Sequence, residues 1–175
     1  MLLKEELALV VRAQNGDRSA LGDLWDSITP KLHGYLVNTV RDQQLAEDLL
    51  QNTWLKAIGA ISQFKAKGVR FSAWLFAIAR NECRQHWRRP GKPELPLQEN
   101  DENEVQVLDK KDFTQTIFLD HLLDQLPHDD QDILRLRYIS DFSFKEIARI
   151  LHIPPITARV RVHRALGRAR ANLAN

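Results

Sequence analysis

The chain has 175 residues, of which 43% are hydrophobic and 27% are charged, with a formal net charge of +2. This composition is typical of a soluble globular protein with one domain or two small ones, and no apolar run reaches the roughly 20 residues that a membrane-spanning helix needs. The first six residues include acids, so we expect no export signal, and the single cysteine, Cys83, excludes an intramolecular disulfide and favours a cytoplasmic location.

The charges are distributed unevenly along the chain. Residues 1–89 carry 13 lysines and arginines against 9 aspartates and glutamates, and residues 145–175 carry 7 against 1. Between them the balance reverses, since residues 90–112 carry 3 against 7. Two basic zones that flank an acidic middle indicate electrostatic interactions with partners.

Apolar residues recur every three or four positions, and no alternating strand-like run occurs, so the sequence predicts an all-α fold. Asp17 and Asp42 are suited to cap the helices that follow them. We expect a first helical domain over residues 1–89, with helices near 3–14, 18–26, 28–39, 43–59 and 71–88.

The predicted helix 43–59 has two distinct faces. Its inward face is expected to consist of Ala46, Leu49, Leu50, Thr53, Trp54 and Ala57. The opposite face carries Asp48, Gln51, Asn52 and Leu55. A leucine among polar residues on the solvated face suits a protein-docking surface, although a single exposed leucine is also ordinary.

Aromatic and basic residues alternate before and within the predicted helix 71–88. Phe64 and Phe71 flank a loop with Lys65, Lys67 and Arg70, and one side of the helix carries Trp74, Asn81, Arg84 and Arg88. This composition is typical of platforms for single-stranded nucleic acid, on which bases stack and phosphates are neutralised. The alternative is that the aromatic residues are core and the arginines form a solvated face.

A proline-rich acidic segment precedes the second predicted domain. Three prolines within residues 90–111 disfavour packed secondary structure, so we interpret this segment as a flexible linker before a second domain over 112–175. The second domain is expected to contain a helix near 113–125 and another that is capped by Asp129 or Asp130.

The C-terminal part of the chain predicts a helix-turn-helix. Ser143 and Glu146 fit a capping box that opens a short helix, His152 lies in the following turn, and Pro155 suits the first turn of the next helix. The last helix is expected to bury Ala158, Val162, Ala165, Leu166 and Ala169.

The outer face of this last helix is rich in arginine. The residues expected to reach phosphates and base edges are Thr157, Arg159, Val160, Arg161 and Arg164. The alternative is a solvated basic helix that is favoured by the helix dipole.

Three segments in this order resemble bacterial RNA polymerase sigma factors of the extracytoplasmic-function (ECF) group in the sigma-70 family. The first two are DQQLAEDLLQNTWLKA (42–57) and FKAKGVRFSAWLFAIARNECRQHWRR (64–89), which resemble parts of sigma region 2. The third is LDQLPHDDQDILRLRYISDFSFKEIARILHIPPITARVRVHRALGRAR (123–170), which resembles sigma region 4.

The resemblance implies a role for each surface. Residues 48, 51, 52 and 55 would dock on core RNA polymerase. The aromatic and basic residues from 65 to 88 would melt and read the minus-ten promoter element, and the last helix would read the minus-thirty-five element as duplex. The implied partners are core polymerase, through its beta-prime clamp and beta flap, promoter DNA and an anti-sigma factor. No cofactor, metal or catalytic activity is implied.

Two other classes of protein are compatible with parts of the sequence. A helix-turn-helix regulator with an unrelated sensory domain would bind duplex DNA without replacing the sigma subunit. An enzyme with a metal site could begin from Cys83 and His86, which lie three residues apart, but the other histidines lack ligand spacing.

Overall fold

The computed structural model describes residues 3–88, 123 and 125–173. All secondary structure in this part of the chain is helical, which confirms the all-α prediction. The chain divides into two compact units, residues 1–94 and 95–175. The predicted linker 90–111 and most of the predicted helix 113–125 lie outside the described residues. No helix in the described ranges is long and apolar enough to cross a membrane.

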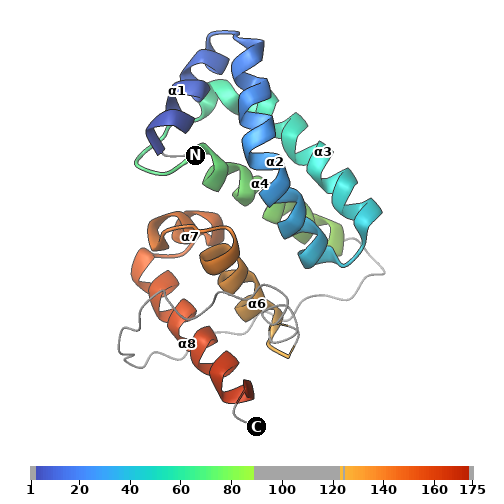
Figure 1. Cartoon of the computed structure of the whole chain (residues 1–175), viewed down its shortest axis with the longest axis vertical. Helices are drawn as coiled ribbons and strands as arrows, with labels where there is room; N and C mark the ends of the chain where they lie inside the picture. Colours follow the sequence, from blue (N-terminus) through green and yellow to red (C-terminus); the bar gives the residue numbers. More distant parts are fainter. Residues whose placement is uncertain (1–2, 89–122, 124, 174–175) are drawn as a thin grey trace. The chain divides into compact units, whose positions relative to one another are not determined.

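Over residues 3–88, the first unit is a bundle of four α-helices. In it α2 packs against α1 and α3, and α3 packs against α4 (Figure 1). A short 3-10 turn, η1, follows α3 directly and leads into the loop before α4. The bounds of these elements are α1 (Leu3–Gln14), α2 (Arg18–Val40), α3 (Gln43–Ala60), η1 (Ile61–Gln63) and α4 (Phe71–Trp87).

Helix α2 is continuous, although the sequence predicts two helices, 18–26 and 28–39. It runs for 23 residues with Pro30 inside it. A proline inside a helix costs about 3 kcal/mol, but residues on both sides of Pro30 belong to one buried face. This face includes Leu24, Ile28, Leu32 and Leu36. Tertiary packing of that face therefore outweighs the local preference to break the helix, and the prediction of two helices was wrong.

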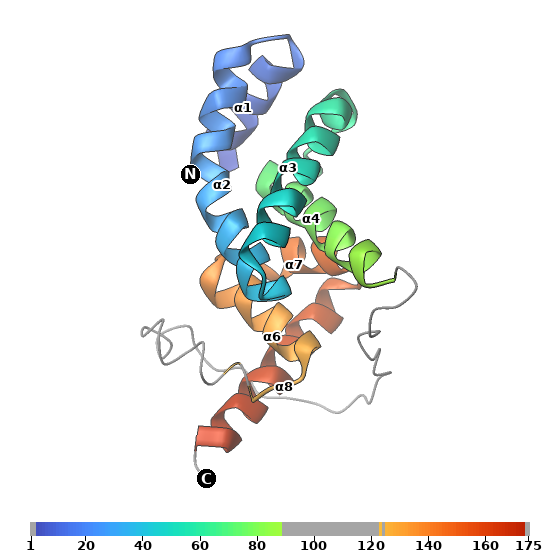
Figure 2. The same cartoon turned by 90° about the vertical axis from the view of Figure 1, so that its right-hand side faces the viewer.

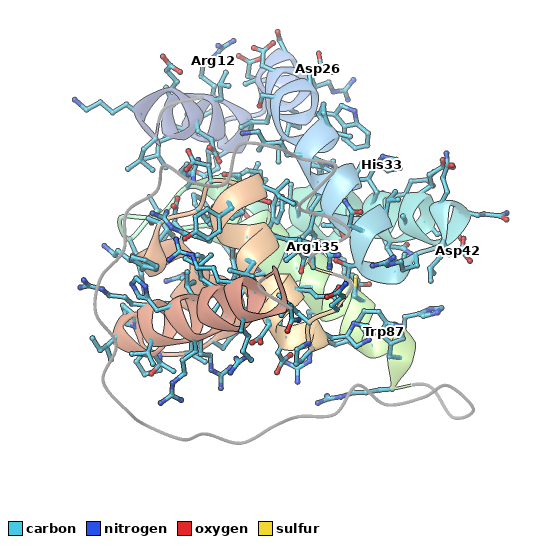
Figure 3. All side chains as sticks on the ribbon, turned by 60° about the horizontal axis from the view of Figure 1, so that its bottom comes forward. Arg12, Asp26, His33, Asp42, Trp87 and Arg135 are labelled. Carbon is cyan, nitrogen blue, oxygen red and sulfur yellow. The ribbon has the colours of Figure 1, made fainter. Side chains whose placement is uncertain are left out.

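The predicted caps of this unit are confirmed. The Asp17 carboxylate accepts hydrogen bonds from the amides of Ser19 and Ala20 at the start of α2. The Asp42 carboxylate accepts one from the amide of Leu45, and Figure 3 shows Asp42 at the start of α3. Because these caps satisfy amides that have no partner within the helix, they set where both helices begin.

Aromatic side chains form the centre of this bundle. Trp54 is 2% exposed, and its ring centroid lies 5.0 Å from that of Trp25 on α2. Its indole Nε1 donates a hydrogen bond of 3.1 Å to the Thr29 hydroxyl, so its polar atom is satisfied. Tyr35 and Phe76 join α2 to α4 with a centroid separation of 5.2 Å. Each buried ring stabilises the fold by roughly 1.5–3 kcal/mol relative to an exposed one.

The second unit packs its last helix against the two before it. Helix α8 contacts both α6 and α7, and in Figure 2 it leads to the C-terminus. A π-helical turn, η3, continues α6 and precedes the helix-turn-helix. The bounds are α6 (His128–Leu134), η3 (Arg135–Ile139), α7 (Phe144–Leu151) and α8 (Pro155–Leu173).

The start of α6 differs from the prediction. Its N-cap is Pro127, which makes no side-chain cap, whereas Asp129 and Asp130 lie inside the first turn. Acids in a first turn still favour the helix through its dipole. Asp130 is buried and pairs with Arg168 of α8, so its carboxylate is used for tertiary packing and not for capping.

Candidate nucleic-acid interfaces

The outer face of α3 is exposed as predicted, and all six residues predicted to face inward are buried. Asp48, Gln51 and Asn52 are exposed, and Leu55 is 68% exposed. Ile58, which the sequence analysis did not identify, is 45% exposed one turn after Leu55. The sequence could have identified Ile58, because positions three apart on a helix are neighbours and Leu55 was already expected at the surface. The surface is thus polar with two apolar side chains at one end.

The loop between η1 and α4 holds two lysines in solvent. Lys65 and Lys67 are exposed, whereas Val69 is 2% exposed and points into the unit. Lys67 and Gly68 have φ values of 37° and 73°, and the Val69 amide donates to the Ala66 carbonyl at 2.8 Å. Left-handed backbone at a residue other than glycine is uncommon and is maintained only by surrounding structure. The loop therefore contains a tight turn over residues 66–69.

Three aromatic rings support this loop. Trp74 lies 5.4 Å from Phe64 and 5.3 Å from Phe71 between ring centroids, and the two phenylalanines contact each other edge-on at 5.3 Å. Phe64 and Phe71 are 7% and 0% exposed, so both are core residues. Trp74 is half-buried and keeps part of its ring at the surface. Of the three rings, Trp74 alone remains accessible enough to stack with a ligand.

The other predicted residues of α4 follow Trp74 along the helix. Asn81 and Arg88 are exposed, Arg84 is half-buried, and Arg70 of the preceding loop is half-buried too. Figure 3 shows Trp87 near the C-terminal end of the same helix. One helix and its preceding loop therefore present aromatic, amide and cationic groups in succession.

The helix-turn-helix forms as predicted. The Ser143 hydroxyl accepts from the Glu146 amide at 3.3 Å, and the Glu146 carboxylate accepts from the Ser143 amide at 2.8 Å, which completes the capping box. Helix α7 ends at Leu151, and its C-cap, His152, has a left-handed φ of 58°. Helix α8 then begins at Pro155, so the two prolines separate two helices.

Helix α8 buries all five residues that were predicted to face inward. Of the predicted outer residues, Arg159 is exposed, and Thr157, Val160, Arg161 and Arg164 are half-buried. Ile156 is 67% exposed in the first turn, and the sequence analysis did not identify it. The sequence could have identified Ile156, because it directly precedes Thr157, which was expected on the outer face. The first turn therefore presents an apolar side chain beside polar and cationic ones.

Two side chains of α8 have pKa values shifted from their ordinary values. Hydrogen bonds from Arg168 to Asp130 raise the pKa of Arg168, so this arginine connects α8 to α6. Burial lowers the pKa of His163, and the charge of Arg159 one turn earlier lowers it further. The His163 ring lies 6.3 Å from the Phe144 ring of α7. The lowered pKa of His163 favours its neutral form, and its ring packs near that of Phe144.

Within the described ranges, no group of three or more histidine, cysteine or acidic side chains is arranged to hold a metal ion. Cys83, from which a metal site could have begun, is fully buried in the first unit.

Comparisons with known proteins match both units. Residues 24–92 match the family described as sigma-70 region 2, and residues 119–168 match sigma-70 region 4. The chain is 32% identical over 162 residues to the RNA polymerase sigma factor CarQ of Myxococcus xanthus, and this match covers 91% of this chain and 92% of CarQ. It is also 32% identical over 149 residues to the ECF sigma factor EcfG of Rhodopseudomonas palustris, covering 82% and 80% of the two chains.

A solved structure has the same fold. The sigma factor RpoE of Bartonella quintana, in a co-crystal with the anti-sigma factor NepR, matches with a TM-score of 0.65 and 24% identity, over 88% of this chain and 96% of that one. The two sigma regions occur in order, and the two relatives match over 92% and 80% of their own length. The chain belongs to the ECF group of the sigma-70 family of RNA polymerase sigma factors.

Proposed function

We propose that this sigma factor, which directs promoter-specific initiation of transcription as its family does, acts through three surfaces. The outer face of α3 binds core polymerase. The loop before α4 and the outer side of α4 bind the melted minus-ten element. The first turns of α8 bind the minus-thirty-five element as duplex.

The polymerase surface is centred on Leu55. This leucine is 68% exposed, and polar residues at 48, 51 and 52 surround it. An apolar anchor with a polar rim is typical of protein interfaces, where a few anchors contribute most of the binding energy. Ile58 extends the apolar part by one turn.

The minus-ten surface is centred on Trp74. Extrusion of a base from a duplex costs a few kcal/mol, and stacking on an aromatic side chain returns roughly 1–3 kcal/mol per base. The half-buried Trp74 ring has both the support from Phe64 and Phe71 and the accessible part that stacking needs. Lys65, Lys67, Arg70, Asn81, Arg84 and Arg88 supply hydrogen bonds and positive charge for the displaced strand.

The single observation that carries the proposal is the geometry of the helix-turn-helix. Helix α8 buries its small and apolar face completely, so Arg159 and the other cationic side chains of its first turns lie at or near the surface. In this motif the N-terminal residues of the second helix contact base edges in the major groove. Arginine is the residue that pairs best with guanine there.

An anti-sigma protein is the proposed regulator, and the cytoplasm is the proposed location. The sigma factor RpoE of Bartonella quintana, which has the same fold and is seen in a co-crystal with an anti-sigma factor, supports this partner. By analogy with the family, the acidic segment 90–111 would lie in the RNA-exit path of the polymerase, where negative charge mimics nucleic acid.

The decisive experiment is transcription in vitro with purified core polymerase, this protein and a genomic library of promoters. We expect transcripts to start downstream of a shared two-part sequence, and only when the protein is present. A helix-turn-helix regulator would give no transcripts unless another sigma factor were added. Transcripts that need a second sigma factor would therefore overturn the proposal.

A further inference from the structure

Helix α1, to which the proposed function assigns no role, contacts both ends of the loop between η1 and α4. At one end, the Gln14 side-chain amide donates hydrogen bonds to the carbonyls of Ile61 and Phe64, at 2.8 and 3.1 Å. At the other end, the Glu6 carboxylate accepts from the amide and the hydroxyl of Ser72. Figure 1 shows the segment between α3 and α4 passing beside α1.

The contact from Glu6 replaces a missing helix cap. The N-cap of α4 is Arg70, whose side chain makes no capping hydrogen bond. Ser72 is two residues inside the helix, and its amide is one of those that a cap normally satisfies. Glu6 is 2% exposed and Ser72 is 8% exposed, so solvent does not replace this bond. A carboxylate at this position also complements the positive end of the helix dipole.

The contacts from Gln14 fix the other end. Its two carbonyl acceptors belong to the 3-10 turn and to Phe64, which immediately precedes Lys65. Between the two braced ends, Val69 anchors the loop in the core and Lys67 adopts its left-handed conformation. A loop that is held at both ends and once in the middle presents its exposed lysines in one geometry.

We infer that Glu6 and Gln14 are positioning residues that set the geometry of the minus-ten loop, and hence the selectivity of this sigma factor for its minus-ten element. The inference rests on the proposed function of that loop. Neither side chain needs to contact DNA, since each acts through the backbone of residues 61–72. A side chain that must discriminate between bases needs a fixed support, because a small displacement removes its advantage for the correct base.

The test compares wild type with Gln14→Ala, Glu6→Ala, Glu6→Gln and a matched control, Arg12→Ala. Arg12 lies on the same helix, is shown at the surface in Figure 3, and pairs with Asp17, away from the loop. Each protein is assembled with core polymerase. For each holoenzyme we compare two affinities. The first is for a single-stranded oligonucleotide with the intact minus-ten sequence, and the second is for one in which the base that contributes most to wild-type binding is replaced.

The ratio of the two affinities is the decisive quantity. Partial unfolding lowers both affinities by the same factor and leaves the ratio unchanged, whereas a misplaced loop lowers the ratio. We expect Gln14→Ala to reduce it about three- to tenfold, which corresponds to the loss of one or two hydrogen bonds. Arg12→Ala should keep the wild-type ratio.

Glu6→Gln provides a second, conservative variant. Its amide oxygen still accepts from the Ser72 amide, so we expect a smaller loss of the ratio than for Glu6→Ala. If Glu6→Ala fails to fold, Gln14→Ala still decides the question. An unchanged ratio for Gln14→Ala would overturn the inference. If wild-type holoenzyme itself shows no preference between the oligonucleotides, the proposed minus-ten function has failed instead.

Discussion

Arg168 of α8 donates two hydrogen bonds to the Asp130 carboxylate of α6, one from Nε to Oδ2 and one from Nη2 to Oδ1 at 2.7 Å. The Asp130 side chain is 10% exposed and the Arg168 side chain is 52% exposed. One arginine of the basic last helix thus links α8 to α6 within the second unit.

Asp130→Ala is therefore expected to lower the free energy of unfolding of the second unit by about 1–2 kcal/mol, since a paired and partly buried charge is lost. All four tryptophans lie in the first unit, at 25, 54, 74 and 87. Circular dichroism in urea should consequently show the loss, while tryptophan fluorescence should not. Asp129→Ala, in the same helical turn but exposed, is the control; it loses only the favourable interaction with the helix dipole and should have a smaller effect.

Leu55→Glu is expected to weaken binding to core polymerase at least about tenfold, because central apolar anchors contribute 2 kcal/mol or more to an interface. The measurement is a competition titration against a labelled sigma factor. Val11→Glu makes the same chemical change at a 55% exposed position on α1. Equal affinities for the Leu55 and Val11 variants would argue against a polymerase contact at Leu55.

Trp74→Ala is expected to impair strand opening at least about fivefold per folded holoenzyme, because base stacking on the ring is lost. Permanganate reactivity of minus-ten thymines measures opening, and a footprint at low temperature measures the closed complex, which should form normally. Trp25→Ala removes a 38% exposed ring from α2, outside the minus-ten surface, and per folded holoenzyme it should open promoters as wild type does. Reactivity equal to wild type for Trp74→Ala would contradict the proposed role.

Ile156 is expected to contact a thymine methyl group in the minus-thirty-five element, because it is 67% exposed in the first turn of α8 and apolar side chains recognise that methyl group. The test replaces each thymine of the element with uracil, which lacks the methyl group. One replacement should weaken binding of wild-type holoenzyme, and Ile156→Ala should abolish that difference. If no thymine replacement affects wild type, Ile156 does not recognise a methyl group.

The second unit is expected to lose stability as the pH falls below about 6.5, in part through His163. Burial lowers the pKa of this histidine in the folded protein, so the unfolded chain binds a proton more readily. Its contribution to stability is thus complete above the unfolded pKa and is lost as the pH falls through the folded pKa. Urea unfolding at pH 7.5 and 5.5 should show a smaller pH effect in His163→Gln. An equal pH effect in both proteins would exclude His163 as a cause of the pH dependence of stability.

Much of the fold could be predicted from the sequence because it depends on neighbours along the chain. The caps at Asp17 and Asp42, the capping box at Ser143 and the start of α8 at Pro155 all arise from groups within three or four residues of one another. Helical periodicity likewise identified the buried faces of α3 and α8, since it needs only the spacing of apolar residues.

The candidate site could be predicted only in part. Periodicity placed Leu55 and Arg159 at the surface, but it could not decide how three aromatic rings divide between core and surface. The structure buries Phe64 and Phe71 and leaves part of Trp74 accessible. That division depends on which helices lie above each ring, and spacing within one helix contains no such information.

By itself, the sequence determined the all-α fold, the caps at Asp17, Asp42 and Ser143, the helix-turn-helix and the resemblance to the family. Only the tertiary structure decided that α2 continues through Pro30, that Glu6 caps a helix 66 positions away, and that Asp130 pairs with an arginine 38 positions away. The physical reason is that hydrogen bonds and packing between distant residues form only when whole helices pack together. A pattern of neighbouring residues in the sequence therefore cannot predict them.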